Sequence, residues 1–290
     1  MSVINGKGGL LSQDSGSNTI GGIQDWRITP NHNSPAGIVA ASGGMQVVVP
    51  TQVTDWTMEY AFAGYSPPAL PGTSYTFMGY NGSERASGSV ICESVTIDVD
   101  IEGGNIITGT ARFGSNGALT LASGSAPTVG TGSALTMYGA TGAKARWQPI
   151  IAGTAGTDAD IPDVRRWSLS LNCALAPYVS SSTAGVTQRT AGNLSASASL
   201  SFYQGALSYL SASATRLTPG AYGVLKLYTT ASLFYGLTYS VVKDLNGQVQ
   251  VEAGTNNGID LNFDYSGWAL VSGTLTRGAL VLPDTTNFWS

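Results

Sequence analysis

The sequence predicts an all-β protein made of two tandem, related β-sandwich or half-barrel domains, each with at most one short helix. Gly, Ser and Thr, which form helices poorly, make up about a third of the 290 residues. Short segments alternate apolar and polar residues between Gly-, Pro- and Asn-rich turns. The second half of the chain also repeats features of the first half. Hydrophobic residues form 42% of the chain, which is enough for a packed core and argues against disorder.

The alternating segments are the predicted strands. The clearest is 95–102, where apolar and polar residues alternate before a Gly103-Gly104 turn and a return strand at 106–113. A similar pair is expected at 248–252 and 259–264. Further strands are expected at 24–30, 54–62, 74–80, 165–171, 194–203, 223–229 and 235–243, and a short helix near 206–214.

The internal repeat is anchored by Trp26 and Trp167, which lie 141 residues apart in similar contexts. At that offset Gly64 matches Gly205, and residues 60–64 align with 201–205. The offset grows to 148 where Pro71-Gly72 matches Pro219-Gly220, and to 150 where Gly104 matches Gly254 and Phe113 matches Phe263. Small loop insertions explain an offset that only increases. We therefore expect related units at 1–121 and 147–290, joined by a Gly/Ser/Thr-rich linker at 122–146.

The charge balance excludes some functions. Lys and Arg number 13 against 17 Asp and Glu, and the only basic pair is Arg165-Arg166. A protein that grips nucleic-acid phosphates needs many cations on one face, so tight duplex binding is not expected. Residues 1–8 lack the pattern of a secretory signal, and no apolar stretch of about 18 residues predicts a membrane helix. We expect synthesis in a cytosol, with Cys92 and Cys173 as free thiols.

No catalytic residue, cofactor site or metal site is predicted, so we expect the protein not to be an enzyme. His32, the single histidine, lies in a Pro- and Asn-rich loop without the motif of a nucleophilic serine. Asp98, Asp100 and Glu102 loosely resemble the start of a calcium loop, but the apolar residues between them predict the acidic face of a strand. Carboxylates on one strand face also do not flank a cleft as a glycosidase pair does.

The six tryptophans divide into two groups. Trp26 and Trp167 occupy matching positions within strands, so we expect both in the core. The other four have no matching partner, and we expect them at contacts specific to one unit. They are Trp56, Trp147, Trp268 and Trp289.

The opening segment resembles that of the tail tube proteins of long-tailed bacteriophages. The residues that carry this resemblance are Val3-Ile4-Asn5-Gly6-Lys7-Gly8-Gly9, followed by Ile20-Gly21-Gly22-Ile23-Gln24-Asp25-Trp26. Residues 116–120 (Asn-Gly-Ala-Leu-Thr) resemble the close of the same domain, and the acidic strand 95–103 resembles its penultimate strand. In the second unit, residues 224–228 resemble the family's central strand, whereas the opening Gly-Lys turn is absent.

The resemblance implies β-sandwich domains whose inner sheets join into rings that stack into a hollow tube. A duplicated chain would close such a ring as a pseudo-sixfold trimer, with a six-subunit ring as the alternative. Its partners would be other copies of itself, tail proteins at the tube ends, and genomic DNA that passes without tight binding; no membrane and no cofactor are implied. The protein would be assembled in the host cytoplasm and located in the virion tail.

Two placements follow from the same resemblance. If Asp98, Asp100 and Glu102 face the lumen, their charge would repel DNA and let it slide. The long Gly-bearing segments 36–50 and 177–192 would dock onto the next ring.

Two other classes stay open at this point. One is a different virion component, such as a head decoration protein or a tail adaptor, which would form isolated trimers or caps. The other is a secreted carbohydrate-binding β protein or glycosidase, which would bind sugar and could be a monomer.

Overall fold

Strands form almost all of the regular structure, as the sequence predicts. The computed structural model describes residues 4–6, 9–12, 23–31, 36–38, 46–48, 55–63, 69–81, 84–123, 140–203, 217–247, 258–265, 268–271, 274–277 and 280–281. Within these ranges the helical elements are the short 3-10 turns Ala140–Gly142 and Ser181–Thr183. The segment 206–214, where a helix is expected, lies outside the described residues.

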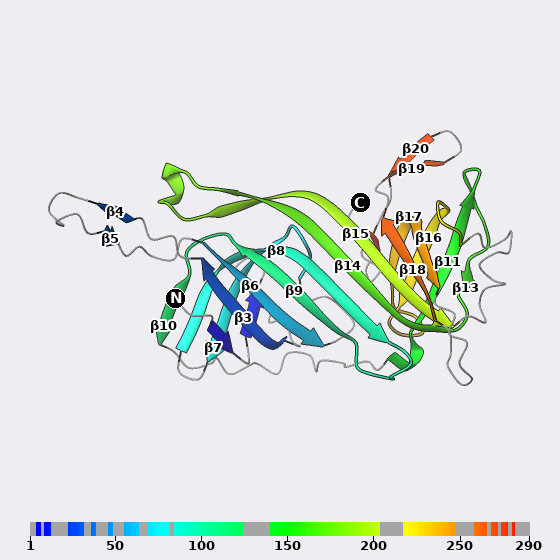
Figure 1. Ribbon diagram of the computed structural model, residues 1–290, viewed down its shortest axis with the longest axis horizontal. Helices are drawn as coiled ribbons and strands as arrows, with labels where there is room; N and C mark the ends of the chain where they lie inside the picture. The colour runs from blue at the N-terminus through cyan, green and yellow to red at the C-terminus, as the bar shows by residue number, and fades with distance from the viewer. Residues whose placement is uncertain are drawn as a thin grey trace.

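The strands follow each other along the chain with all pairings antiparallel (Figure 1). In the first half they are β1 (Ile4–Gly6), β2 (Gly9–Ser12), β3 (Ile23–Asn31), β4 (Ala36–Ile38), β5 (Gln46–Val48), β6 (Asp55–Ala63), β7 (Ser74–Asn81), β8 (Glu84–Asp100), β9 (Thr108–Ser115) and β10 (Thr120–Ser123). In the second half they are β11 (Lys144–Ile151), β12 (Thr154–Ala155), β13 (Ala159–Asp160), β14 (Val164–Tyr178), β15 (Gln188–Tyr203), β16 (Tyr222–Tyr228), β17 (Phe234–Gly247), β18 (Gly258–Tyr265), β19 (Trp268–Val271), β20 (Thr274–Arg277) and β21 (Leu280–Val281).

The first half folds into a sandwich whose two layers share the long strand β8. One layer contains β3, β6, β9 and the C-terminal half of β8; the other contains β2, β7, β10 and the N-terminal half of β8. Aromatic side chains pack between the layers. The rings of Trp26 and Phe77 lie 5.4 Å apart, and those of Tyr75 and Phe113 lie 6.2 Å apart. Burial of such rings is a main stabilising term for a sandwich core.

The second half is arranged in the same way around β17. One layer contains β14, β15, β18 and the C-terminal part of β17; the other contains β11, β16, β21 and the N-terminal part of β17. Here the rings of Trp167 and Tyr235 lie 6.2 Å apart, and those of Trp147 and Phe263 lie 5.6 Å apart. Trp56 and Trp147 are also fully buried, one in the core of each sandwich.

Strand pairing runs in the same order in the two halves. The order β3–β6–β9–β8–β7 corresponds to β14–β15–β18–β17–β16, and both halves carry a bulge after the first residue of β3 or β14. A second bulge lies at Glu93 in β8 and at Lys243 in β17. Trp26 lies opposite Tyr60, and Trp167 lies opposite Leu200. Tyr60 therefore corresponds to Leu200, at an offset of 140. The sequence alignment, with its offset of 141, matches Tyr60 with Ser201 instead.

The turn before β7 and the turn before β16 are also alike. Gly72 has a φ of +83° and Gly220 a φ of +86°, a backbone conformation that favours glycine. The Gly72 N–H donates to the Cys92 carbonyl over 2.8 Å, and the Gly220 N–H donates to the Val242 carbonyl over the same distance. The Pro-Gly turn thus holds the start of β7 against β8 in the first half, and the start of β16 against β17 in the second half.

Several observed strand ends differ from the predicted ones, and two of these differences have a clear physical reason. β11 begins at Lys144, inside the expected linker, because it pairs with β16 from that residue onward. β8 ends at Asp100, two residues before the expected end, because the Asp100 side chain accepts a hydrogen bond from the Gly103 N–H and forms the turn. Residues 124–139 of the expected linker lie outside the described ranges.

Candidate assembly junction and polar sheet face

The two sandwiches join through the edges of β8 and β14. Seven residue pairs form this junction, from Ser94 opposite Asn172 to Asp100 opposite Arg166. One continuous layer therefore runs through β3, β6, β9, β8, β14, β15, β18 and β17 (Figure 1). Pairing satisfies the backbone groups that a free sheet edge would expose. The junction shows how one sandwich of this type can extend the sheet of another.

One end of the junction is fixed by Glu102. Its carboxylate accepts hydrogen bonds from Arg165 Nε over 2.7 Å and from the Tyr203 hydroxyl over 2.8 Å. The Arg165 guanidinium also lies over the Tyr203 ring at 4.8 Å. The hydrogen bond from Tyr203 lowers the pKa of Glu102, and Arg165 lowers it further. These contacts join the turn after β8 to the second sandwich.

The other end is fixed by Arg189, in the hairpin arm (residues 173–192, the outer part of β14 and β15). Arg189 Nη2 donates to Asp55 Oδ1 over 2.7 Å, and Nη1 donates to the Ser115 carbonyl and hydroxyl. Gly114 provides room, because a Cβ there would lie 2.5 Å from Arg189 Cδ. Burial raises the pKa of Asp55, but Arg189, Ser115 and Asn31 together lower it below its usual value.

The hairpin arm thus lies along the first sandwich of its own chain. It passes close to the Gly72 turn, where Cys173 and Ala191 of the arm approach the glycine. Beyond this contact the arm exposes Tyr178 and Val179. Docking of its tip onto a neighbouring ring, and of the β4–β5 hairpin likewise, stays a prediction.

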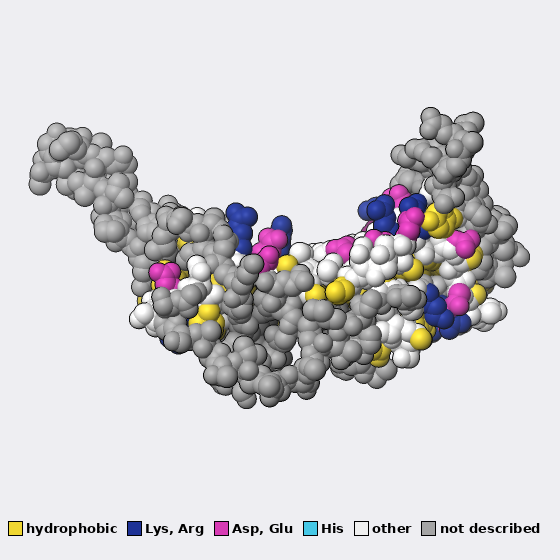
Figure 2. Space-filling model, turned by 90° about the horizontal axis from the view of Figure 1, so that it is seen from below, with side chains coloured by type: hydrophobic (Ala, Val, Ile, Leu, Met, Phe, Trp, Pro, Cys, Tyr) yellow, Lys and Arg dark blue, Asp and Glu magenta, His cyan; other side chains and the backbone are white. Residues whose placement is uncertain are grey.

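The joined layer has one apolar and one polar face. The apolar face packs in the two cores, whereas the polar face carries mostly Ser, Thr, Asn and charged residues. On the described polar face the acidic residues include Asp25, Asp55, Glu59, Asp98, Asp100, Asp244, Asp260 and Asp264, and the basic residues include Arg27, Arg112, Arg166 and Lys243, which pairs with Asp264. Figure 2 shows charged side chains of both signs in small separate groups rather than as one continuous patch. This face is therefore hydroxyl-rich and, on balance, acidic.

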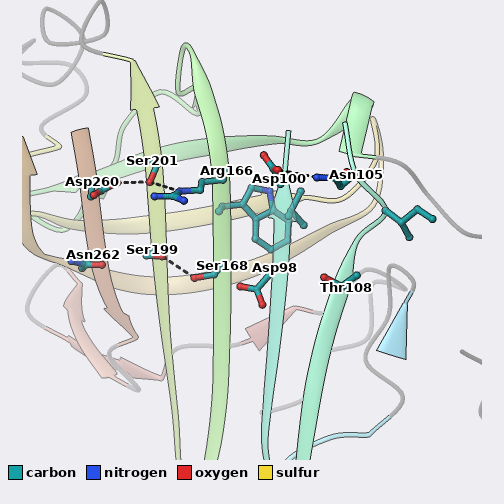
Figure 3. Close-up of a pocket in the computed structure, with 13 residues that line it drawn as sticks. Asp98, Asp100, Asn105, Thr108, Arg166, Ser168, Ser199, Ser201, Asp260 and Asn262 are labelled. Atoms are coloured by element: carbon teal, nitrogen blue, oxygen red, sulfur yellow. Dashed lines mark hydrogen bonds between the residues drawn. The ribbon is translucent and has the colours of Figure 1, made fainter. Parts of the chain in front are cut away.

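A hollow of about 750 Å³ lies on this face where the two sandwiches join (Figure 3). Its polar lining comes from strands of both sandwiches, including Asp98, Ser168, Ser199 and Asn262. Ser168 and Ser199 share a hydrogen bond of 2.8 Å across β14 and β15. Farther along, Arg166 Nε donates to the Ser201 hydroxyl, which donates to Asp260. The joined layer is hollowed on its polar side at this point.

The three acidic residues singled out from the sequence have different environments. Asp98 projects from β8 into the hollow, and burial raises its pKa. The Asp100 carboxylate accepts hydrogen bonds from the Gly103 N–H and the Asn105 amide, each over 3.0 Å. Glu102 is expected on the acidic face of the strand, but it lies in the turn after β8 and pairs with Arg165. Sequence alternation identified Asp98 and Asp100 but gave no sign of Arg166 or Asp260.

The free edges of the joined layer differ from each other. At the β17 end, no described strand pairs with the edge of residues 245–247 that faces away from β18, and Leu245 is 38% exposed. At the β3 end, β1 covers part of the edge, with Gly6 opposite Trp26 and Ile4 opposite Ile28. Pro30 follows on the same edge.

The remaining predicted residues divide between the core and the undescribed ranges. Trp26 and Trp167 are buried, each 2% exposed. Cys92 and Cys173 are free and buried, as predicted, and burial raises the pKa of the Cys92 thiol. Gly104 lies in the turn after β8 with a φ of +60°. Gly64, Gly205, Gly254, His32, Trp289 and the Trp268 side chain lie outside the described residues.

The described part of the chain lacks two features that would indicate other functions. It contains no group of three or more His, Cys, Asp or Glu side chains placed to hold a metal ion. In the same ranges, no helix has the length and apolar character needed to span a membrane. Neither a protein-family model nor a curated protein matches the sequence.

Proposed function

We propose that this chain is a structural subunit of a bacteriophage tail tube, formed from stacked rings that conduct DNA. The β8–β14 junction is the observation that carries the proposal. It shows two sandwiches of the same pairing order extending one sheet edge to edge. If the sandwiches are tandem copies of one module, the same junction made between chains would continue the sheet around a ring.

The ring is proposed to contain three chains. Three two-sandwich chains supply six modules, so the ring would have pseudo-sixfold symmetry. Head-to-tail contacts of one kind form a closed ring when a whole number of the rotations between neighbouring modules adds up to one full turn. A ring of six chains is the alternative within the same proposal.

In this arrangement the polar face lines the lumen. Hydroxyl groups are frequent on this face, and carboxylates outnumber Lys and Arg side chains, so its described part carries no continuous cationic track for phosphates. The hollow at the junction indicates concavity on this side of the sheet. DNA would pass without being held, and no substrate would be turned over.

Negative-stain microscopy of the purified protein tests the proposal. Periodic hollow tubes, or stacked rings after concentration, are expected. Monomers at all concentrations would contradict it, and isolated trimers or caps would indicate a head decoration protein or tail adaptor instead. A glycan-array screen of the same sample checks the carbohydrate-binding alternative and is expected to show no binding.

A further inference from the structure

We infer that β1 is a removable cap on β3, and that β17 of a second copy displaces it when two chains join. The inference rests on the proposed function, because it concerns the contact between neighbouring subunits. The partner is a second copy of this chain, and the template is the junction between β8 and β14 within one chain.

The corresponding strands define a register for the contact between chains. β3 corresponds to β14, and β17 corresponds to β8, by their pairing order and their bulges. Transferring the β8–β14 pairs to these strands places Thr29 of one copy opposite Asn246 of the other. The four pairs that fall on described residues are Ile28 with Gly247, Thr29 with Asn246, Pro30 with Leu245, and Asn31 with Asp244.

Val95 on β8 and Leu245 on β17 hold corresponding positions but differ in exposure, because only β8 is paired with β14. Val95 lies opposite Leu171 in the junction and is fully buried. Leu245 holds the corresponding position on β17 and is 38% exposed. A second copy placed like β14 would cover it, and burying an exposed leucine at a sheet edge favours association.

The β3 edge is protected against this pairing in the free chain. The Trp56 N–H points to Ser115 on β9, so the Pro30–Trp56 pair is not hydrogen-bonded and Pro30 directs its nitrogen to the outer edge. Pro30 therefore has no N–H to donate at the outer edge. Because backbone groups alternate along a strand, those of Trp26 and Ile28 point to the same outer edge. β1 pairs with these two residues. A short added strand and a proline are both ways to block an edge.

β1 and an incoming β17 would occupy the same edge. β1 lies opposite residues 26–28, and the transferred register of β17 begins at Asn31 and runs into Ile28. β1 makes three pairs with β3, and the transferred register gives β17 four pairs on described residues. β17 can therefore pair first at residues 29–31, where no described strand covers this edge, and then displace β1 from Ile28.

A reversible lock on β1 tests the inference. Asn5 lies opposite Arg27, and alternation makes this a non-hydrogen-bonded pair, whose Cα atoms are typically about 4.5 Å apart and within disulfide range. The variant Asn5→Cys/Arg27→Cys is expected to assemble at least ~10-fold more slowly when oxidised, with wild-type assembly restored by reductant. The single variants, oxidised in the same way, are controls. Equal assembly of the oxidised and reduced protein would overturn the inference.

The register is tested by a second cysteine pair. Thr29→Cys/Asn246→Cys is expected to form bonds between chains and give a cross-linked trimer on a non-reducing gel. Ser170→Cys/Thr96→Cys, at the matching positions of the internal junction, should cross-link only within one chain. If the wild type and the variant both form tubes but the variant shows no 29–246 cross-link, the register is overturned and the proposed function is left intact. Failure of the wild type to form any ring would contradict both.

Discussion

Arg189 and Asp55, 134 residues apart in sequence, form an ion pair of 2.7 Å that ties the hairpin arm to the first sandwich. Their side chains are only 12% and 25% exposed. Arg189→Ala would leave the Asp55 carboxylate and the Ser115 carbonyl without this donor. We expect a loss of about 2 kcal/mol in the free energy of unfolding, measured by urea denaturation.

A lysine at this position is the matched control. Arg189→Lys keeps the charge but cannot reach Asp55 and Ser115 with separate nitrogens, so it should fall between the wild type and Arg189→Ala. If both variants were as stable as the wild type, the arm would not be held by this contact.

Acid should weaken the same contact. The pKa of Asp55 is lower in the folded chain than in the unfolded chain, so the ionised carboxylate stabilises the fold. This contribution is present above the usual carboxylate pKa of about 4 and is lost as the pH falls through the lower folded value. Unfolding measured from pH 6 to pH 2 should show a smaller acid-dependent loss in Asp55→Asn than in the wild type. Parallel curves would exclude Asp55 as a source of the pH dependence.

Introducing a backbone N–H donor at position 30 of β3 should strengthen the proposed contact between chains. Pro30→Thr supplies an N–H at the outer edge, opposite the carbonyl of Leu245 in the transferred register. One additional hydrogen bond contributes about 0.5–1.5 kcal/mol, so the critical concentration for assembly should fall about two- to tenfold. Light scattering across a dilution series measures it. An unchanged or higher critical concentration, with monomer stability preserved, would place the interface elsewhere.

Reversing a charge on the polar face should make the surface bind DNA. Asp98→Lys adds a cation to the hollow, whereas Glu84→Lys makes the same net change on the other layer, at the start of β8. In assembled tubes we expect Asp98→Lys to slow the passage of DNA or retain it in a salt-dependent manner, and Glu84→Lys to have no such effect. Fluorescence anisotropy of labelled DNA distinguishes the two. Equal binding by both variants would argue against a lumenal polar face.

Much of the fold could be predicted because alternation is a local signal. The segments 74–80, 223–229 and 259–264 differ from the observed strands by one residue at one or both ends. The N-terminal half of β8 was missed, since Ser87, Gly88 and Ser89 interrupt the alternation. Gly88 is explained by packing, because a Cβ there would lie 2.5 Å from the Trp56 ring.

The contacts of the candidate site could not be predicted in the same way. Asp98 and Asp100 stand out in one strand, but Arg166 and Asp260 join them only through pairing across β14, β15 and β18. The Arg189–Asp55 pair depends on how far the hairpin arm extends, which a Gly- and Ser-rich sequence does not reveal. The offset of 140 at Tyr60 likewise becomes clear only from its position opposite Trp26.

Image averaging of end-on rings by electron cryomicroscopy tests the central claim most directly. The account predicts a closed annulus of three chains, with six sandwiches joined edge to edge by contacts like that between β8 and β14, and the polar face inward. Rings of six chains would change the stoichiometry but keep the junction. An annulus whose subunits meet through other surfaces, or a protein that stays monomeric at every concentration, would contradict it.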